Sequence, residues 1–178
     1  MSLFELAIPS FLQSLRVLVQ LLDKAEAHFQ DQPAGFAALR LASDMKPFAF
    51  QIEAAINNAV GAAARLRGLP APRIEGLATL SDMRDGLVAA ITELEAVKAH
   101  EFEGAEAREI VVPSPKGARH FESLDYVRRL ALPNVHFHTA IAYALLRKEG
   151  VDIGKRDFLG DLPARRSPAG QPGQLTAP

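Results

Sequence analysis

The sequence contains no cysteine. Structural disulfides, thiolate zinc sites and a cysteine nucleophile are therefore excluded, and any metal site would use His, Asp, Glu or water as ligands. The chain also lacks an excess of charge of either sign, since its formal net charge is -1 and its pI is about 6.5. Nucleic acid and anionic lipid both attract a basic surface, so we expect neither as a partner.

Long uncharged apolar runs are missing too, so we expect no membrane-spanning helix. Residues 1–5 lack the basic region and cleavage site of a signal peptide, which makes the cytoplasm the expected compartment. A length of 178 residues with a hydrophobic fraction of 48% suits one domain with a sizeable core. From Asp161 onward the chain is rich in proline and glycine. We therefore predict a domain over 1–160 and a disordered tail over 161–178.

The first segment of the chain shows the clearest helical pattern. Apolar residues across 3–30 are spaced alternately four and three residues apart, which keeps one stripe facing a partner helix. Ser2 and Glu5 form a capping box at its start. Pro9 falls inside the predicted helix and should bend it, because its ring clashes with the carbonyl one turn earlier.

Two further helices are predicted in the middle of the chain. The same spacing over 34–67 predicts a second helix that kinks at Pro47 and ends at Gly68. Its second half is rich in alanine, which predicts close packing against a neighbour. A third helix should begin after a Thr79 cap and run to about His100.

Residues 101–122 break the helical pattern. A β-prone run at 108–112, a Pro- and Gly-containing turn, and a return at 118–121 predict a small hairpin. We expect a short helix after Ser123 and a last long helix from Pro133 to about residue 149. The sequence thus predicts an all-α four-helix bundle with a hairpin and short-helix insertion before the last helix.

Three motifs carry a family resemblance, and they read Arg40-Leu41-Ala42-Ser43-Asp44-Met45, Ala131-Leu132-Pro133-Asn134 and Gly154-Lys155-Arg156-Asp157-Phe158-Leu159-Gly160. In this order they resemble the family catalogued as domain of unknown function 1993, which is similar to the DinB-like, or YfiT-like, group of helical bundles. The resemblance covers roughly residues 1–160. It implies a DinB-like four-helix bundle, often a homodimer. It implies no reaction, because the family is uncharacterised.

The resemblance also raises the question of a metal. DinB-like bundles often hold a divalent metal with three histidines, one from the second helix and a His-x-x-x-His pair from a later helix. This chain has no histidine in its second predicted helix and no such pair. His138 and Asp44 are the remaining candidates for a divalent-metal site. We expect the purified protein to carry little stoichiometric metal.

Four residues form the candidate pocket. His138 should face the bundle interior, where it could bind a metal, transfer a proton, or simply be a buried histidine with a polar partner. Asp44 and Gln51 are seven residues apart and would share a helix face that meets His138. Asp44 could orient His138, or both side chains could satisfy backbone groups freed by Pro47. Tyr143 could present its hydroxyl to the pocket or pack as an ordinary core residue.

The segment 154–160 lacks the pattern of a phosphate-binding loop. We expect Phe158 and Leu159 to pin it onto the bundle, while Lys155 or Arg156 could instead clamp a substrate.

Two functional hypotheses follow from these residues. The first is a dimeric small-molecule binding or interaction module. The alternative is a metal-assisted transferase or hydrolase of the DinB-like type, centred on His138 and Asp44. The missing histidine pattern favours the first.

Overall fold

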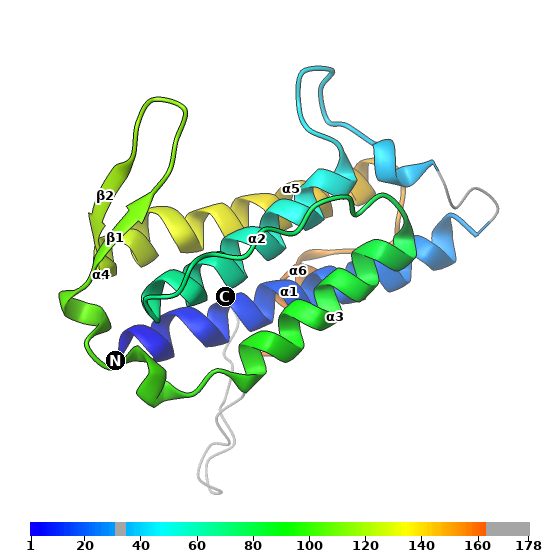
Figure 1. The fold of residues 1–178 in the computed structure, drawn as a ribbon. Coiled ribbons are helices and arrows are strands. Elements are labelled where there is room, and N and C mark those ends of the chain that lie inside the picture. Colours follow the sequence, from blue (N-terminus) through cyan, green and yellow to red (C-terminus); the bar gives the residue numbers. More distant parts are fainter. Residues whose placement is uncertain (31–34, 163–178) are drawn as a thin grey trace, which may run out of the picture.

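The computed structural model describes residues 1–30 and 35–162, which form a helical bundle with a small hairpin (Figure 1). The four long helices are α1 (Leu3–His28), α2 (Phe48–Leu66), α3 (Leu80–Ala96) and α5 (Leu132–Lys148). Helix α1 packs against α3 and α5, and α2 packs against the same two helices from the other side. The all-α bundle predicted from the sequence is therefore confirmed.

Helix α1 begins as its sequence predicts. The Ser2 hydroxyl accepts from the Glu5 N–H, and the Glu5 carboxylate accepts from the Ser2 N–H at 2.8 Å. Its apolar stripe is buried in the core. Helix α1 is long and apolar enough to cross a membrane, but helices buried in the core of a soluble protein can have the same length and composition. Pro9 lies within the helix, as expected.

Helix α2 is shorter than predicted, so the predicted helix start at residue 34 is wrong. A 3-10 turn, η1, occupies Phe36–Ala38, residues 39–47 form a loop, and α2 begins only at Phe48. Pro47 is the N-cap and not a kink. Proline disfavours helical backbone at the preceding residue, while its fixed φ and missing N–H suit a helix start. The Phe48 N–H closes the loop by donating to the Leu39 carbonyl at 2.9 Å.

The end of α2 and the start of α3 follow their sequence signals. Gly68 has φ +75°, and the N–H groups of Gly68 and Leu69 return to the carbonyls of Arg65 and Ala64. This pattern is a Schellman motif, in which a left-handed glycine ends the helix. Thr79 forms a capping box with Asp82 at the start of α3. Helix α3 ends at Ala96, before the predicted His100.

The predicted hairpin is present. Strands β1 (Glu109–Val112) and β2 (Arg119–Glu122) pair antiparallel, with Ile110 opposite Phe121. Figure 1 shows the hairpin rising from one end of the bundle. Two short 3-10 turns, η2 (Ala99–Phe102) and η3 (Ala105–Ala107), lead into it.

The short helix expected after Ser123 is not separate from the last long helix. Helix α4 (Ser123–Tyr126) continues through a π turn, η4 (Val127–Ala131), directly into α5. The Leu132 N–H donates to the Val127 carbonyl, five residues back. Pro133 cannot donate to a carbonyl and its ring crowds the turn before it, so a widened turn there accommodates the proline without breaking the rod.

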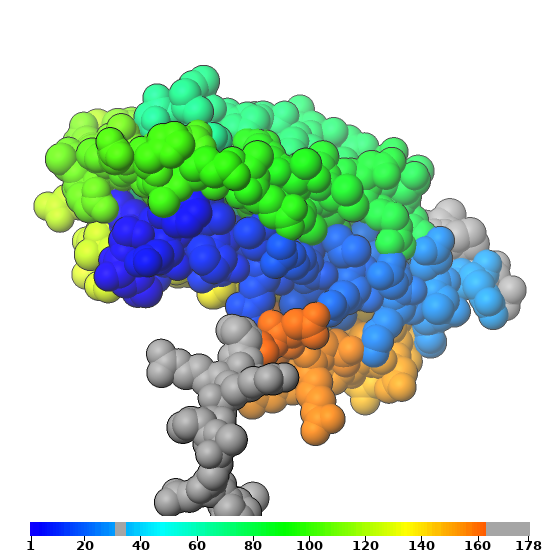
Figure 2. All heavy atoms as spheres, turned by 90° about the horizontal axis from the view of Figure 1, so that it is seen from below, coloured from blue at the N-terminus to red at the C-terminus, as the bar shows by residue number. Residues whose placement is uncertain are grey.

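Helix α6 (Lys155–Leu159) fixes the segment after α5 onto the bundle. Gln13 Nε2 donates to the Leu159 carbonyl at 2.8 Å, and Lys24 Nζ lies 2.7 Å from Asp157 Oδ1. Figure 2 shows α6, in orange, against α1, in blue. The segment 154–160 is attached to the bundle as predicted, but through the Leu159 carbonyl, the Asp157 carboxylate and the contact of the Phe158 ring with Tyr143 rather than by burial of Phe158 and Leu159 in the core. Most of the predicted disordered tail, 161–178, lies outside the described residues, which end at Leu162.

Candidate functional site

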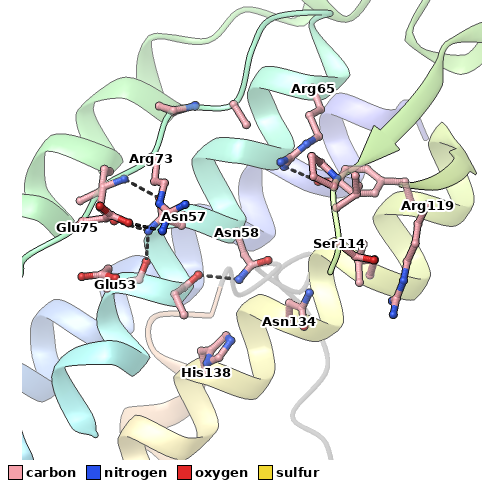
Figure 3. Close-up of a pocket in the computed structure, with 18 of the residues that line it drawn as sticks. Glu53, Asn57, Asn58, Arg65, Arg73, Glu75, Ser114, Arg119, Asn134 and His138 are labelled. Carbon is pink, nitrogen blue, oxygen red and sulfur yellow. Dashed lines mark hydrogen bonds and ion pairs between the residues drawn. The ribbon is translucent and has the colours of Figure 1, made fainter. Parts of the chain in front are cut away.

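A groove of about 690 Å³ runs along the outer face of α2. Its walls come from the loop that follows α2, from the hairpin, and from the rod formed by α4, η4 and α5 (Figure 3). Helix α2 and this rod are antiparallel, because residue 51 meets residue 138 and residue 65 meets residue 126. The groove therefore has a His138 end and an Arg65 end.

His138 is held by a neutral relay. Gln51 Nε2 donates to the Lys46 carbonyl at 3.0 Å, which turns Gln51 Oε1 towards His138 Nδ1, 2.8 Å away. An amide oxygen can only accept a hydrogen bond, so Nδ1 carries the proton and Nε2 is the unprotonated nitrogen. The relay fixes the tautomer without placing a negative charge beside the ring.

The environment of His138 favours its neutral form. Burial lowers the pKa of His138 below its ordinary value of 6.5, because a charged imidazolium loses hydration there. Nε2 has no protein partner in the described ranges, and no polar side-chain atom there is both fully buried and unpaired. Solvent therefore reaches Nε2 from the groove, where it is available as a hydrogen-bond acceptor.

Asn57 and Glu53 fix the loop that forms one wall. The Asn57 amide donates to the Ile74 carbonyl at 2.7 Å and accepts from the Ile74 N–H at 2.8 Å. Glu53 Oε2 accepts from the Gly76 N–H at 3.0 Å. By contrast, Asn58 donates only to the Ala54 carbonyl of its own helix, at 2.7 Å. Asn57 and Glu53 thus hold the loop that forms this wall against α2, and the groove beside it stays open.

Arg65 marks the other end of the groove. Its Nη1 donates to the Tyr126 hydroxyl at 3.3 Å, and Tyr126 is only 3% exposed. Burial raises the pKa of Tyr126 above its ordinary value, so the phenol stays neutral. Gly61 lies one turn before Arg65, and a Cβ built at Gly61 would come within 3.0 Å of Arg65 Nη1. The glycine leaves room for the guanidinium to lie back along α2.

The structure brings two of the four predicted pocket residues together. Gln51 and His138 meet as expected, although His138 is half-buried and lines the outer groove where the bundle interior was predicted. Asp44 lies in the exposed loop before α2 and not on a helix face with Gln51. The misplaced helix start explains this correction. Tyr143 packs edge-on against Phe158, with ring centroids 5.8 Å apart, and does not line the groove.

Sequence reasoning missed Arg65 and Tyr126. One signal was present, because Arg65 is a lone charge inside the alanine-rich, mostly buried run that ends α2. The partner of Arg65 could not be inferred, since Tyr126 lies 61 residues further along the chain.

The described residues do not fit the metal site of DinB-like bundles. Within 1–30 and 35–162, no group of three or more His, Asp or Glu side chains is placed to hold a metal ion. His138 contacts an amide and the rings of Phe50 and Phe137, while Asp44 is in its exposed loop.

The comparisons with known proteins agree with the fold. No curated protein matches the chain. A DinB family member protein from Shewanella denitrificans, known from its crystal structure, is 29% identical and covers 93% of this chain and 96% of its own, with a TM-score of 0.84. Residues 3–159 match the family described as domain of unknown function, DUF1993. The chain therefore belongs to the DUF1993 family, and its fold is DinB-like.

Proposed function

We propose that this protein binds a small organic molecule in the groove along α2. One observation carries the proposal, namely an oriented His138 Nε2 that lines a groove of ligand size and has no protein partner in the described ranges. Small-molecule sites are typically concavities of about 300–1,000 Å³ with a few placed polar groups. A ligand hydroxyl or amine N–H donates to Nε2, because Nδ1 is already committed to Gln51.

The order of the groove in the absence of a ligand supports the same proposal. Asn57 and Glu53 tie one wall to α2, and Gln51 holds the His138 ring. A site whose walls and polar groups are already ordered loses little conformational freedom when a ligand binds. The metal-assisted transferase or hydrolase alternative gains no support here, since no group of three or more His, Asp or Glu side chains among the described residues could hold a metal ion.

A fragment screen on isotope-labelled full-length protein tests the proposal. We expect hits to perturb the amide signals of α2 and of the 70–76 loop. Hits that carry a hydroxyl or amine should weaken in His138→Gln. His136→Gln is the matched control, because His136 lies two residues away and is exposed. Fragments that bind only elsewhere, or no binding at all, would overturn the proposal.

A further inference from the structure

Resting on the proposed function, we infer that the ligand carries an anionic group, a carboxylate or a phosphate, which Arg65 binds at the hairpin end of the groove. The one side-chain hydrogen bond of Arg65 within the described residues goes to a neutral phenol, and none of the ion pairs there includes it. Arg65 is half-buried and lines the groove.

Nearby acids do not neutralise this end. The acidic residues that line the groove are Glu53 and Glu75. Glu53 precedes Arg65 by twelve residues on α2, which is about 18 Å along the helix axis. Glu53 bonds the Gly76 N–H and Glu75 pairs with Arg73, and Figure 3 shows these side chains grouped away from Arg65.

A second cation lines the groove from the hairpin. Arg119 of β2 lines the same groove and is likewise outside the ion pairs of the described residues. Two acids are close in sequence to Tyr126, namely Asp125, which pairs with Arg129 at 3.3 Å, and Glu122, and neither lines the groove. Ser114 and Asn134 add neutral polar groups on the hairpin and α5 sides of the groove (Figure 3). The hairpin end is therefore a positive, hydrogen-bonding wall.

Gly61 on α2 leaves the space that the Arg65 guanidinium occupies. A glycine weakens a helix interior relative to alanine, yet here it leaves the space into which Arg65 folds back. Tyr126 then orients one edge of the guanidinium. The remaining N–H donors are planar and paired, which matches the two oxygens of a carboxylate or phosphate.

Matched probe pairs test the inference on the full chain. Benzoate against benzamide, and phenyl phosphate against phenol, differ in charge while keeping the ring. We expect at least one acid to bind about tenfold tighter than its neutral partner by NMR titration, since a bidentate ionic hydrogen bond supplies that difference. The better acid assigns the class, carboxylate or phosphate.

Three variants locate the effect. Arg65→Gln should remove the preference for the acid. Gly61→Ala keeps the charge but forces the guanidinium to shift, so it should reduce the preference in a protein whose fold is unchanged by circular dichroism. Arg128→Gln removes an exposed cation outside the groove lining and should keep the wild-type preference.

The outcomes separate this inference from the proposed function. Equal binding of acid and neutral partner, with signals that map to the groove, overturns the anion site and leaves the groove as a ligand site. An acid preference that survives in both Arg65→Gln and Gly61→Ala also overturns it. Absence of binding by all four probes overturns the anion site, and a fragment screen that is also empty overturns the proposed function with it.

Discussion

The His138 imidazole shows how one residue can be poised by neutral neighbours alone. Gln51 is in turn oriented by a backbone carbonyl, so the ring has a fixed tautomer and no counter-ion. A histidine with a carboxylate partner would hold its proton more strongly. Here the same geometry keeps Nε2 free to accept at neutral pH.

This arrangement predicts a pH dependence of stability. The folded pKa of His138 is below its ordinary value, so between those two values the unfolded chain binds more protons. Unfolding free energy should therefore rise with pH through that window. Urea unfolding at about pH 5.5 and about pH 7.5 should show a smaller rise in His138→Gln than in wild type. Equal rises in the two proteins would contradict this account, and His136→Gln should behave as wild type.

Asn57 gives a second prediction at this scale. Asn57→Ala removes both hydrogen bonds to Ile74 and should lower the unfolding free energy by about 1–3 kcal/mol, because two backbone groups lose their partner. The Ile74 amide should also exchange faster with solvent. Asn58→Ala is the control, since Asn58 bonds only within its own helix. If both variants lose the same stability, Asn57 does not anchor the wall.

Among the elements, the contact between α2 and α3 depends on a glycine. A Cβ at Gly86 would lie 3.2 Å from the Leu77 side chain and 3.4 Å from Ile56 Cδ1. We expect Gly86→Leu to lower the unfolding free energy by about 1–3 kcal/mol through overpacking, as measured by urea unfolding. Ala89→Leu on the exposed face of α3 should change it little. A stabilised Gly86→Leu would show that the interface can open to accept the side chain.

Local signals predicted most element ends correctly. The Ser2 and Thr79 caps, the hairpin and the Gly68 stop act over a few residues, so sequence alone identifies them. The start of α2 was mispredicted because Leu41 and Met45 continue the apolar spacing across Pro47, where proline prevents the helix from continuing backwards.

The candidate site was only partly predictable, because some of its contacts depend on the path of the chain and not on local signals. Gln51 and His138 lie within well-predicted helical stretches, so their meeting follows from helix faces. Asp44 was placed by a helix that does not extend to it. Arg65 depends on Tyr126, and their contact required the three-dimensional path of the crossover.

For the whole molecule, we propose self-association. The family resemblance implies a homodimer, and the large apolar side chain of Phe137 on α5 is 52% exposed, so it is available for a contact with a second copy. Light scattering at micromolar concentration should give about twice the 19.3 kDa chain mass. Phe137→Glu should shift the protein towards monomer, whereas Val88→Glu on α3 should not. A wild-type monomer would contradict the proposal.

The π turn at Val127–Ala131 separates Tyr126 from His138 along one continuous rod. A π turn amounts to one residue more than a regular helix needs, and each residue turns a helix by about 100°. Regular winding of all the residues from Tyr126 to His138 would set the two side chains about 120° apart around the rod, whereas a turn that absorbs one residue leaves them only about 20° apart. The phenol that orients Arg65 and the imidazole held by Gln51 therefore face the same groove because the π turn absorbs one residue. The winding of the rod thus sets the relative orientation of the Tyr126 and His138 side chains without a direct contact between them.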